Sequence, residues 1–446
     1  MTIRKAIEPG GATTSSTGLQ PQVGIVGAGL AGLSASRALK GERIEHLVFE
    51  REETPGGLAR SFEVDGFHFD CSGHLLHLRD PELRTSVLAA SPRGSWVEVN
   101  RKSSVLLADH LIRYPFQGNL VDAPEHIRRD CLAALPPEMS SRLAPETLGE
   151  WIDLNLGEGI ANWFMRPYNE KLFGVSVDDL IPNALGRFLP QVDREAIIEG
   201  AKRGSPPDGY NVRFLYPKRG GISLLPSYFM KEVGPLCLGQ SVREIDLDSL
   251  VVRTSNEVSY HFPKGMISSI PLPTLMKMVG LGKSDALRAR SVTCVNLGFP
   301  ERTSLLGSSH WVYLPEDRFN AYRVGLYSNI TPTATPKGCA SAYIEIAHWS
   351  DLDDEEALKQ ATADAVALGL IGDASEILAT HVFRIPEAYV VMDSEYEETR
   401  SSALKTLETS GVQPVGRYGL WEYGSMEDAI EQGARAAASI SRNANA

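Results

Sequence analysis

The first fifty residues alternate between short apolar runs and a segment with helical spacing. Residues 23–26 have the sequence Val-Gly-Ile-Val, and residues 46–49 form a second apolar run, His-Leu-Val-Phe. Between them, residues 34–40 continue with the spacing of a helix. Strands that are buried on both faces of a parallel sheet have such continuous apolar runs, and helices connect them. The pattern therefore predicts a strand–helix–strand unit in a parallel sheet.

The pattern of the remaining chain predicts three further groups of elements. Residues 62–70 alternate around Asp65-Gly66, which indicates a hairpin. From about 122 to 200 the spacing is helical, with a capping box at Thr147 and Glu150 and a helix over 160–166 that we expect Pro167 to stop. Alternation then predicts strands of a second sheet over 291–298, 311–314, 322–327 and 342–346, covered by a helix over 355–368.

These segments predict an α/β fold with three parts. We expect a discontinuous Rossmann-like domain from residues 23–95, 205–285 and 405–446, a helical domain from 118–200, and an antiparallel β-sheet domain for the substrate from 96–117 and 286–404. A chain of 446 residues is long enough for two or three domains. Residues 9–22 are rich in Gly, Ser and Thr, so we expect residues 1–22 to be a disordered tail and not a signal peptide.

Composition and charge narrow the class of protein. The formal net charge of −12 argues against nucleic acid or an anionic membrane as the main partner. The five cysteines are scattered without a CxxC motif, and no histidines lie at ligand spacing, so we expect neither a disulfide framework nor a metal site. With no run of about eighteen apolar residues, nothing predicts a membrane span. These features are typical of a cytoplasmic enzyme.

A glycine motif follows the first apolar run directly. Gly27, Gly29 and Gly32 have the spacing GxGxxG, and Leu30 and Ala31 open the helix. The first two glycines permit a tight turn and close approach of the backbone to a pyrophosphate, and the third permits close packing of helix on strand. Glu50 follows the second strand, about twenty residues on, where a carboxylate can accept a hydrogen bond from a ribose hydroxyl. Together these features predict dinucleotide binding.

A second glycine pair specifies the dinucleotide. A short loop after Glu50 and Arg51 leads to Gly56, Gly57, Leu58 and Ala59. This E-R-x-x-x-x-G-G segment resembles the segment that wraps FAD in flavoproteins of the two-dinucleotide-binding type. The alternative interpretation is a Pro-Gly-Gly turn between strands. We expect FAD as the cofactor.

Several motifs, in order along the folded chain, resemble UDP-galactopyranose mutases, and the eukaryotic-type branch more than the common bacterial one. They are 114–117 (YPFQ), 164–169 (FMRPYN), 216–221 (YPKRGG), 313–317 (YLPED) with 322–323 (YR), and 416–423 (GRYGLWEY). The resemblance implies an isomerase that interconverts pyranose and furanose forms of a nucleoside-diphosphate sugar without net redox. In that family N5 of reduced FAD attacks the anomeric carbon, and NAD(P)H is among the reductants that the resemblance allows.

The resemblance also assigns substrate-binding residues. Arg166 and Arg323 match diphosphate-binding arginines, which we expect to act in catalysis because guanidinium neutralises and binds phosphate oxygens; the alternative is an internal salt bridge for each. Tyr114, Phe116 and Gln117 resemble the base pocket, although Tyr-Pro-Phe is otherwise typical of a core corner. The remaining assignments to the substrate are Asn211, Tyr313, Tyr389 and Tyr423.

Cofactor contacts are implied beyond the two glycine motifs. Gly73 and His74 lie in the segment that the family places against the flavin. We expect His74 to act in catalysis there as a flavin contact, through its backbone or its imidazole, and not as a general base. Val242, Gly416 and Arg417 complete the implied FAD contacts.

The chain departs from the family at positions near the substrate. Ile330 stands where the family has a tyrosine, His77 stands where eukaryotic-type enzymes have a phenylalanine beside the base, and the segment after Tyr423 is shorter. These differences keep a GDP-linked or other sugar nucleotide open as the substrate. An oxidase of the amine-oxidase type and a non-catalytic FAD-fold protein are the alternatives from other classes.

Overall fold

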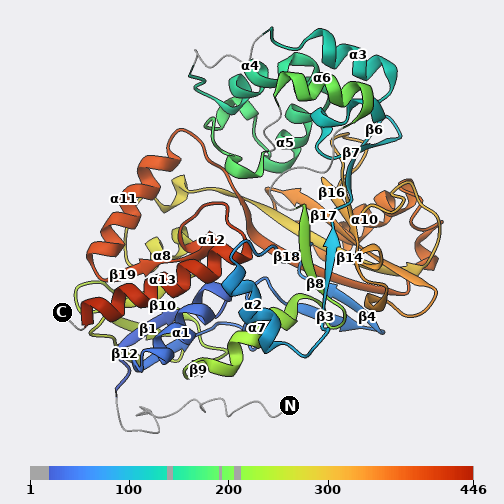
Figure 1. The fold of residues 1–446 in the computed structure, drawn as a ribbon. Coiled ribbons are helices and arrows are strands. Elements are labelled where there is room, and N and C mark those ends of the chain that lie inside the picture. Colours follow the sequence, from blue (N-terminus) through green and yellow to red (C-terminus); the bar gives the residue numbers. More distant parts are fainter. Residues whose placement is uncertain (1–19, 138–143, 190–192, 205–211, 445–446) are drawn as a thin grey trace.

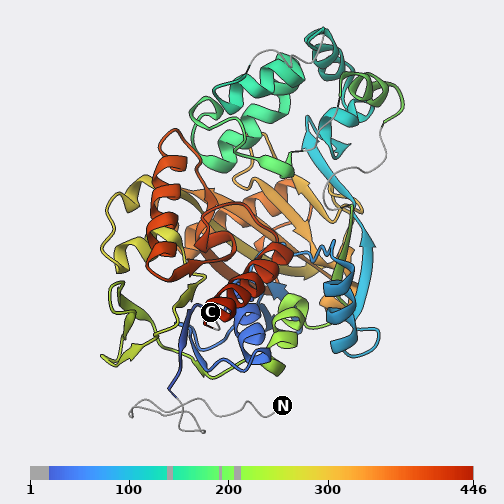
Figure 2. The same cartoon turned by 60° about the vertical axis from the view of Figure 1, so that its left-hand side comes forward.

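The computed structural model describes residues 20–137, 144–189, 193–204 and 212–444, and Figure 1 shows their arrangement. A parallel sheet with its helices forms one end of the molecule, a long antiparallel sheet crosses the middle, and a group of helices forms the other end (Figures 1 and 2). Most of the tail predicted over 1–22 lies outside the described residues, as does Asn211. Within the described part of the chain, no helix is both long and apolar enough to cross a membrane.

The parallel sheet is built from distant parts of the chain. Its strands are β1 (Val23–Val26), β2 (His46–Phe49), β9 (Leu236–Cys237), β13 (Met266–Ser268) and β19 (Val412–Pro414), in the order β19-β13-β1-β2-β9. Helix α1 (Leu30–Gly41) connects β1 to β2 and packs on the C-terminal helix α13 (Met426–Ala444). A Cβ atom at Gly433 of α13 would lie 2.1 Å from the carbonyl oxygen of Ala31. The predicted Rossmann-like unit is therefore confirmed, and it is discontinuous in sequence.

The central sheet has seven strands. They are β18 (Ala379–Val390), β14 (Ala289–Pro300), β17 (Cys339–His348), β16 (Arg323–Leu326), β15 (Trp311–Tyr313), β6 (Ser103–Leu107) and β7 (His110–Arg113), in that order. All neighbours are antiparallel except β15 and β6. Four of these strands were predicted as one sheet, but β18 was not. Its buried and exposed positions do not alternate regularly, and it contains Arg384, Pro386 and Glu387, so it lacks the signal of a half-buried strand.

The region that the sequence predicts to be helical contains α3 (Glu125–Ala133), α4 (Leu148–Ile160), a π-helical turn η3 (Ala161–Met165), α5 (Arg166–Phe173) and α6 (Arg194–Arg203). Thr147 caps α4 by accepting a hydrogen bond from the Glu150 amide at 3.1 Å. The prediction that Pro167 stops a helix was wrong: Pro167 lies in the first turn of α5, directly after the π turn. The first turn needs no amide donor, and the wider π turn precedes the ring of Pro167, so the chain continues as a helix.

The other elements connect these parts. The predicted hairpin is formed by β3 (Ser61–Val64) and β4 (Phe67–Asp70), and β5 (Trp96–Asn100) pairs with β8 (Arg213–Pro217). A small sheet contains β10 (Val242–Asp246), β11 (Val251–Thr254) and β12 (Ser259–His261). The remaining helices are α2 (Pro81–Ala90), α7 (Leu224–Phe229), α8 (Leu272–Met278), α9 (Tyr327–Ile330), α10 (Asp354–Ala367), α11 (Tyr396–Thr409) and α12 (Gly416–Gly419).

Candidate active site

The turn between β1 and α1 has the geometry of a phosphate-binding turn. Gly27 has φ +95°, and a Cβ atom at Gly32 would lie 1.9 Å from the carbonyl oxygen of Gly27, so both positions require glycine. Gly29 is the N-cap of α1 and supplies no side-chain cap, so the first amides of the helix are left for a ligand. The carboxylate of Glu50 accepts hydrogen bonds from the amides of Ala28 at 2.8 Å and Glu52 at 3.0 Å, which fixes it beside this turn.

The second glycine pair and the C-terminal glycine converge on the same turn. Gly29 and Gly56 form a parallel β-bridge, and a Cβ atom at Gly57 would lie 3.1 Å from the Cα atom of Gly29. Gly416 has φ +77°, and a Cβ atom there would lie 3.0 Å from the Cβ atom of Ala31. Three distant segments therefore form one cradle around the N-terminus of α1.

A cavity of about 940 Å³ extends from this cradle to the central sheet. Most of the predicted site residues line it. From the cofactor set these are Gly27, Gly29, Leu30, Ala31, Glu50, Arg51, Gly56, Gly57, Leu58, Ala59, Gly73, His74, Val242, Gly416 and Arg417. From the substrate set these are Tyr114, Tyr313, Arg323, Tyr389 and Tyr423.

Buried polar atoms without partners lie in the lining of this cavity. Among the described residues, Nδ1 of His74, Nε of Arg417 and Oε1 of Gln240 are buried and make no hydrogen bond within the protein. Buried polar groups are normally paired, so these atoms indicate a polar ligand in the cavity. With the glycine cradle at one end, the cavity fits a dinucleotide cofactor.

The segment that holds His74 is anchored from beneath by Glu345 of β17. The Glu345 carboxylate is fully buried and accepts hydrogen bonds from the Ser72 hydroxyl at 2.7 Å and the Gly73 amide at 3.4 Å. A Cβ atom at Gly73 would lie 2.4 Å from the hydroxyl oxygen of Tyr343, so only glycine fits there. Burial lowers the pKa of His74 to about 4, so the imidazole is neutral at pH 7.

Arg323 binds the same carboxylate. Its Nε and Nη2 atoms donate to the two oxygens of Glu345 at 2.5 and 2.9 Å, because β16 and β17 place the two residues directly opposite each other. Burial alone would lower the pKa of Arg323, but Glu345 and neighbouring tyrosines outweigh it, and the pKa lies well above its usual value. The Arg323 side chain keeps a 20% exposed fraction and lines the cavity, so the N–H groups that Glu345 does not use are available to a ligand there.

Tyrosine rings form a wall beside Arg323, which we call the aromatic wall: Tyr114, Tyr168, Tyr313 and Tyr322. The ring of Tyr313 lies 5.0 Å from that of Tyr114 and 5.3 Å from that of Tyr168, and the Arg101 guanidinium lies 5.2 Å from the Tyr114 ring. Tyr322 donates to or accepts from the hydroxyl of Tyr389 at 3.1 Å. Such a wall can stack on a flat ring of a ligand.

Arg166 does not reach the cavity. Its guanidinium donates to Asp153 at 2.6 Å and to Asp178 at 3.1 and 3.2 Å. Gly149 makes room for this cluster, because a Cβ atom there would lie 1.7 Å from the carboxylate of Asp178. The internal salt bridge that the sequence left as an alternative is thus formed, for Arg166 as for Arg323.

Three other predicted residues also lie behind the cavity surface. Phe116 is fully buried and packs on Phe164 with ring centroids 5.2 Å apart, and Gln117 is 1% exposed. Both belong to a 3₁₀ turn, Phe116–Gly118, that directs the chain into the core after Tyr114. Gly32 does not line the cavity, but it shapes the phosphate-binding turn because its lack of a side chain allows α1 to pack against Gly27.

Among the residues of the site to which the sequence analysis gave no role are Glu345, Tyr168 and Tyr322. Glu345 lies in the apolar run 342–346, where a lone carboxylate is itself a signal, because a buried charge needs a partner. Tyr168 lies in the quoted motif FMRPYN but was assigned no role. Within the described part of the chain, no group of His, Cys, Asp and Glu could hold a metal ion.

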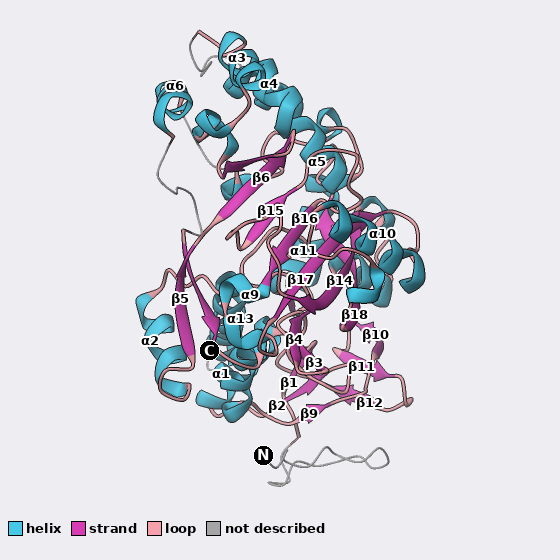
Figure 3. Ribbon diagram, turned by 90° about the vertical axis from the view of Figure 1, so that its right-hand side faces the viewer, coloured by secondary structure: helices cyan, strands magenta, loops and turns pink. Residues whose placement is uncertain are grey.

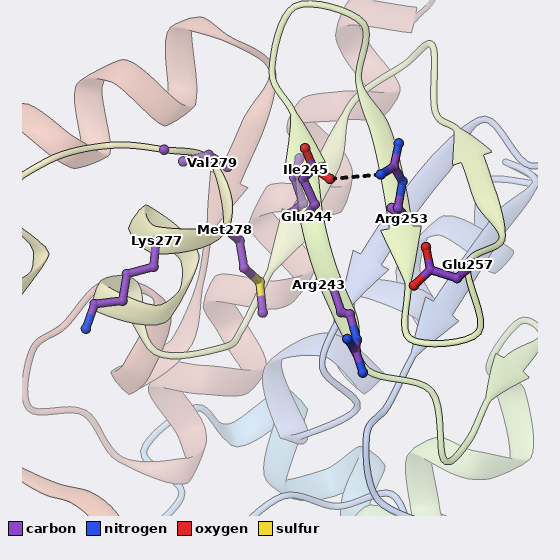
Figure 4. Close-up of a pocket in the computed structure, with 9 residues that line it drawn as sticks. Arg243, Glu244, Ile245, Arg253, Glu257, Lys277, Met278 and Val279 are labelled. Atoms are coloured by element: carbon purple, nitrogen blue, oxygen red, sulfur yellow. Dashed lines mark ion pairs between the residues drawn. The ribbon is translucent and has the colours of Figure 1, made fainter.

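A second hollow, of about 540 Å³, lies on the surface over β10, β11 and α8 (Figure 4). Its charged side chains are exposed, and Glu244 pairs with Arg253 at 3.4 Å. We do not regard it as the active site, because the glycine cradle and the unpaired polar atoms belong to the larger cavity.

Comparison with known proteins agrees with this geometry. The family described as NAD(P)-binding Rossmann-like domain matches residues 25–89, and the family described as flavin containing amine oxidoreductase matches residues 135–441. A crystal structure of reduced UDP-galactopyranose mutase is similar over 96% of this chain and 95% of that chain, with 25% identity and a TM-score of 0.88.

More distant similarities share the fold. A putative protoporphyrinogen oxidase from Exiguobacterium sp. 255-15 has a TM-score of 0.73 at 16% identity, over 94% of this chain and 98% of that chain. Cyclohexylamine oxidase from Brevibacterium oxydans IH-35A has a TM-score of 0.65 at 14% identity, over 96% of this chain and 100% of that chain. The resemblance to UDP-galactopyranose mutases, the fold class and FAD as the cofactor are confirmed.

Proposed function

Because the chain belongs to the flavin-containing amine oxidoreductase family and binds FAD, we propose that it is a nucleoside-diphosphate-sugar mutase. It interconverts the pyranose and furanose forms of the sugar without net redox. By likeness to the mutase structure, UDP-galactopyranose and UDP-galactofuranose are the first substrates to consider. GDP-linked or other hexoses are the alternative within the same chemistry.

One observation carries this proposal: a guanidinium, that of Arg323, lines the same cavity as the FAD cradle, next to the aromatic wall. A diphosphate leaving group carries about two negative charges, and arginine binds phosphate oxygens through paired donors. Glu345 compensates the charge of Arg323, but Arg417, for which the described residues hold no ion-pair partner, also lines the cavity and would repel a cationic amine. The charge of the lining thus favours an anionic substrate over an amine.

In this proposal the protein binds and orients the reactants. The reduced flavin, when bound, supplies an electron-rich nitrogen that can act as nucleophile. The glycine cradle would hold its pyrophosphate, and Gly73 and His74 would lie against its ring system. His74 is neutral at pH 7, so its unpaired Nδ1 can form a hydrogen bond without adding charge.

Arg323 would position the diphosphate, and the aromatic wall would hold the base. Glu345 keeps the Arg323 guanidinium in place, and bidentate pairing fixes its plane. Arg166 would join Arg323 at the diphosphate after leaving Asp153 and Asp178. In the proposed order the substrate binds first. Its diphosphate then replaces the two carboxylates as the partner of Arg166.

The experiment is a comparison of oxidised and reduced enzyme. The purified protein is incubated anaerobically with UDP-galactofuranose, with and without dithionite, and the products are separated by chromatography. A panel of UDP-, GDP- and dTDP-hexoses then identifies the base and the sugar, and NAD(P)H is tested as the reductant.

We expect turnover only with reduced flavin and no consumption of reductant per turnover. Equal turnover in both states would refute the role of the reduced flavin. Oxygen consumption with amines and no sugar isomerisation would instead support an oxidase. Arg323→Ala is expected to abolish isomerisation, whereas Arg302→Ala, which removes a surface partner of Glu376, serves as the matched control.

A further inference from the structure

Lys171 of α5 lies behind the cavity and bridges two parts of its wall. Its ammonium nitrogen donates hydrogen bonds to the carbonyl oxygens of Leu314 at 3.2 Å and Glu316 at 2.9 Å. These carbonyls belong to the connection between β15 and β16, and Figure 3 shows α5 beside the ends of these strands. We refer to residues 314–322 as the wall loop.

The wall loop begins and ends at residues of the candidate site. Tyr313 precedes it, Tyr322 is its last residue, and Arg323 follows it; all three line the cavity. The loop is closed by a hydrogen bond from the Leu314 amide to the Tyr322 carbonyl at 2.9 Å. A displacement of Leu314 would therefore move both ends of the loop.

Helix α5 supplies the facing part of the wall. Tyr168, Asn169, Leu172 and Phe173 of α5 line the cavity. Tyr168 is three residues before Lys171, on the same face of the helix, and its ring lies 5.3 Å from that of Tyr313 and 6.5 Å from that of Tyr322. Lys171 thus ties the helix that carries Tyr168 to the wall loop, which lies between Tyr313 and Arg323.

The partly buried environment of Lys171 supports a structural role for its hydrogen bonds to the wall loop. A partly buried ammonium loses hydration, and here backbone carbonyls replace the water. Burial lowers the pKa of Lys171 to about 8, while Asp364, Asp317 and Glu316 act in the opposite direction. Asp364 of α10 also holds the far end of the loop, accepting hydrogen bonds from the amides of Asn320 at 3.1 Å and Ala321 at 2.7 Å.

We propose that Lys171 is a positioning residue for nucleotide binding: it ties α5 to the wall loop and so sets the spacing between Tyr168 and the Tyr313–Arg323 pair. The proposal rests on the proposed function, because it assigns the aromatic wall to the substrate's nucleotide. Lys171 itself does not line the cavity, so it acts through the residues that it holds. In this proposal the aromatic wall keeps its spacing only while Lys171 is hydrogen-bonded to the wall loop.

The test compares Lys171→Met, which keeps most of the side-chain length and loses the charge and the donors, with Lys171→Arg, which keeps the cation and supplies five N–H donors. Lys202→Met is the matched control, since Lys202 lies on α6 of the same helical region, 65% exposed, and pairs with Glu199 at 3.0 Å. Amide hydrogen exchange is measured over 314–322 in each purified holoenzyme, without substrate. KM and kcat are then measured with reduced enzyme and the sugar nucleotide.

We expect faster exchange in the wall loop of Lys171→Met, a KM raised roughly 10-fold, a kcat within about 2-fold of wild type, and recovery in Lys171→Arg. Unchanged exchange, or faster exchange with an unchanged KM, overturns the proposal. A lower melting temperature with unchanged KM means a merely structural role and also overturns it. If the wild-type enzyme isomerises no sugar nucleotide, the proposed function fails, and hydrogen exchange alone then decides whether the tether exists.

Discussion

The ion pairs of Arg166 allow a quantitative test of its role at the diphosphate. If Arg166 must leave Asp178 to bind substrate, removing the carboxylate charge makes that movement easier. Asp178→Asn keeps the shape of the side chain and hence its contact above Gly149. The variant therefore changes charge with little change in packing.

The size of the effect follows from the exposure of the pair. The Asp178 side chain is 56% exposed, and its two contacts with Arg166 are 3.1 and 3.2 Å long. Exposed ion pairs of this kind typically contribute about 0.2–1 kcal/mol. Releasing Arg166 at that cost corresponds to a KM that is about 1.4- to 5-fold lower.

The assay measures KM and kcat of the reduced enzyme at low and at physiological salt. Glu376→Gln is the control, because it breaks a surface pair with Arg302 at 2.8 Å, away from α4 and α5. The KM of Asp178→Asn should fall while that of the control stays constant, and the difference should shrink as salt screens the pair. A KM that is unchanged or higher in Asp178→Asn would show that Arg166 is a structural residue held by its carboxylates.

Three further predictions concern the segment from Asp70 to His74. Burial raises the pKa of Asp70 from 3.8 to about 6. Because the pKa is raised in the folded state, Asp70 contributes to stability below pH 4, and this contribution of about 3 kcal/mol is lost as the pH rises through 6. The unfolding free energy of Asp70→Asn, minus that of wild type, should therefore rise between pH 4 and pH 7 in guanidinium titrations, and a constant difference would contradict this. Because burial lowers the pKa of His74 to about 4, kcat/KM should show no limb near pH 6.5; a limb there that disappears in His74→Gln would refute the neutral imidazole. Gly73→Ala should lower the ratio of bound flavin to protein several-fold, because its Cβ atom would lie 2.4 Å from Tyr343. The control is Gly41→Ala, which has open space around it and should bind flavin normally. Equal absorbance at 450 nm per protein in the two variants would show that flavin binding does not depend on this contact.

The cofactor end of the site could be predicted from sequence because its signals are local. The turn at Gly27 to Gly32 depends on backbone conformation and on contacts within a few residues, and the distance to Glu50 is set by one helix and two strands. The structure brings these residues together as expected. The convergence of Gly416 on the same turn needed the resemblance, because almost the whole chain lies between them.

The substrate end depended on contacts that sequence spacing does not contain. Glu345 faces Arg323 only because β17 pairs with β16, and Asp178 reaches Arg166 only because Gly149 leaves room for it. The turn after Tyr114 carries Phe116 into the core although Tyr114, Phe116 and Gln117 were all assigned to the base pocket. In each case the contact depends on which residues become neighbours in the folded structure, and this cannot be read from their order along the chain.

The central claim is that a diphosphate binds Arg323 beside the reduced flavin, and a crystal structure of the reduced enzyme with UDP tests it most directly. We predict diphosphate oxygens within hydrogen-bond distance of the Arg323 guanidinium, the base on the aromatic wall, and Arg166 moved from Asp153 and Asp178 toward the diphosphate. UDP bound elsewhere, with Arg323 on Glu345 alone and Arg166 unmoved, would contradict it.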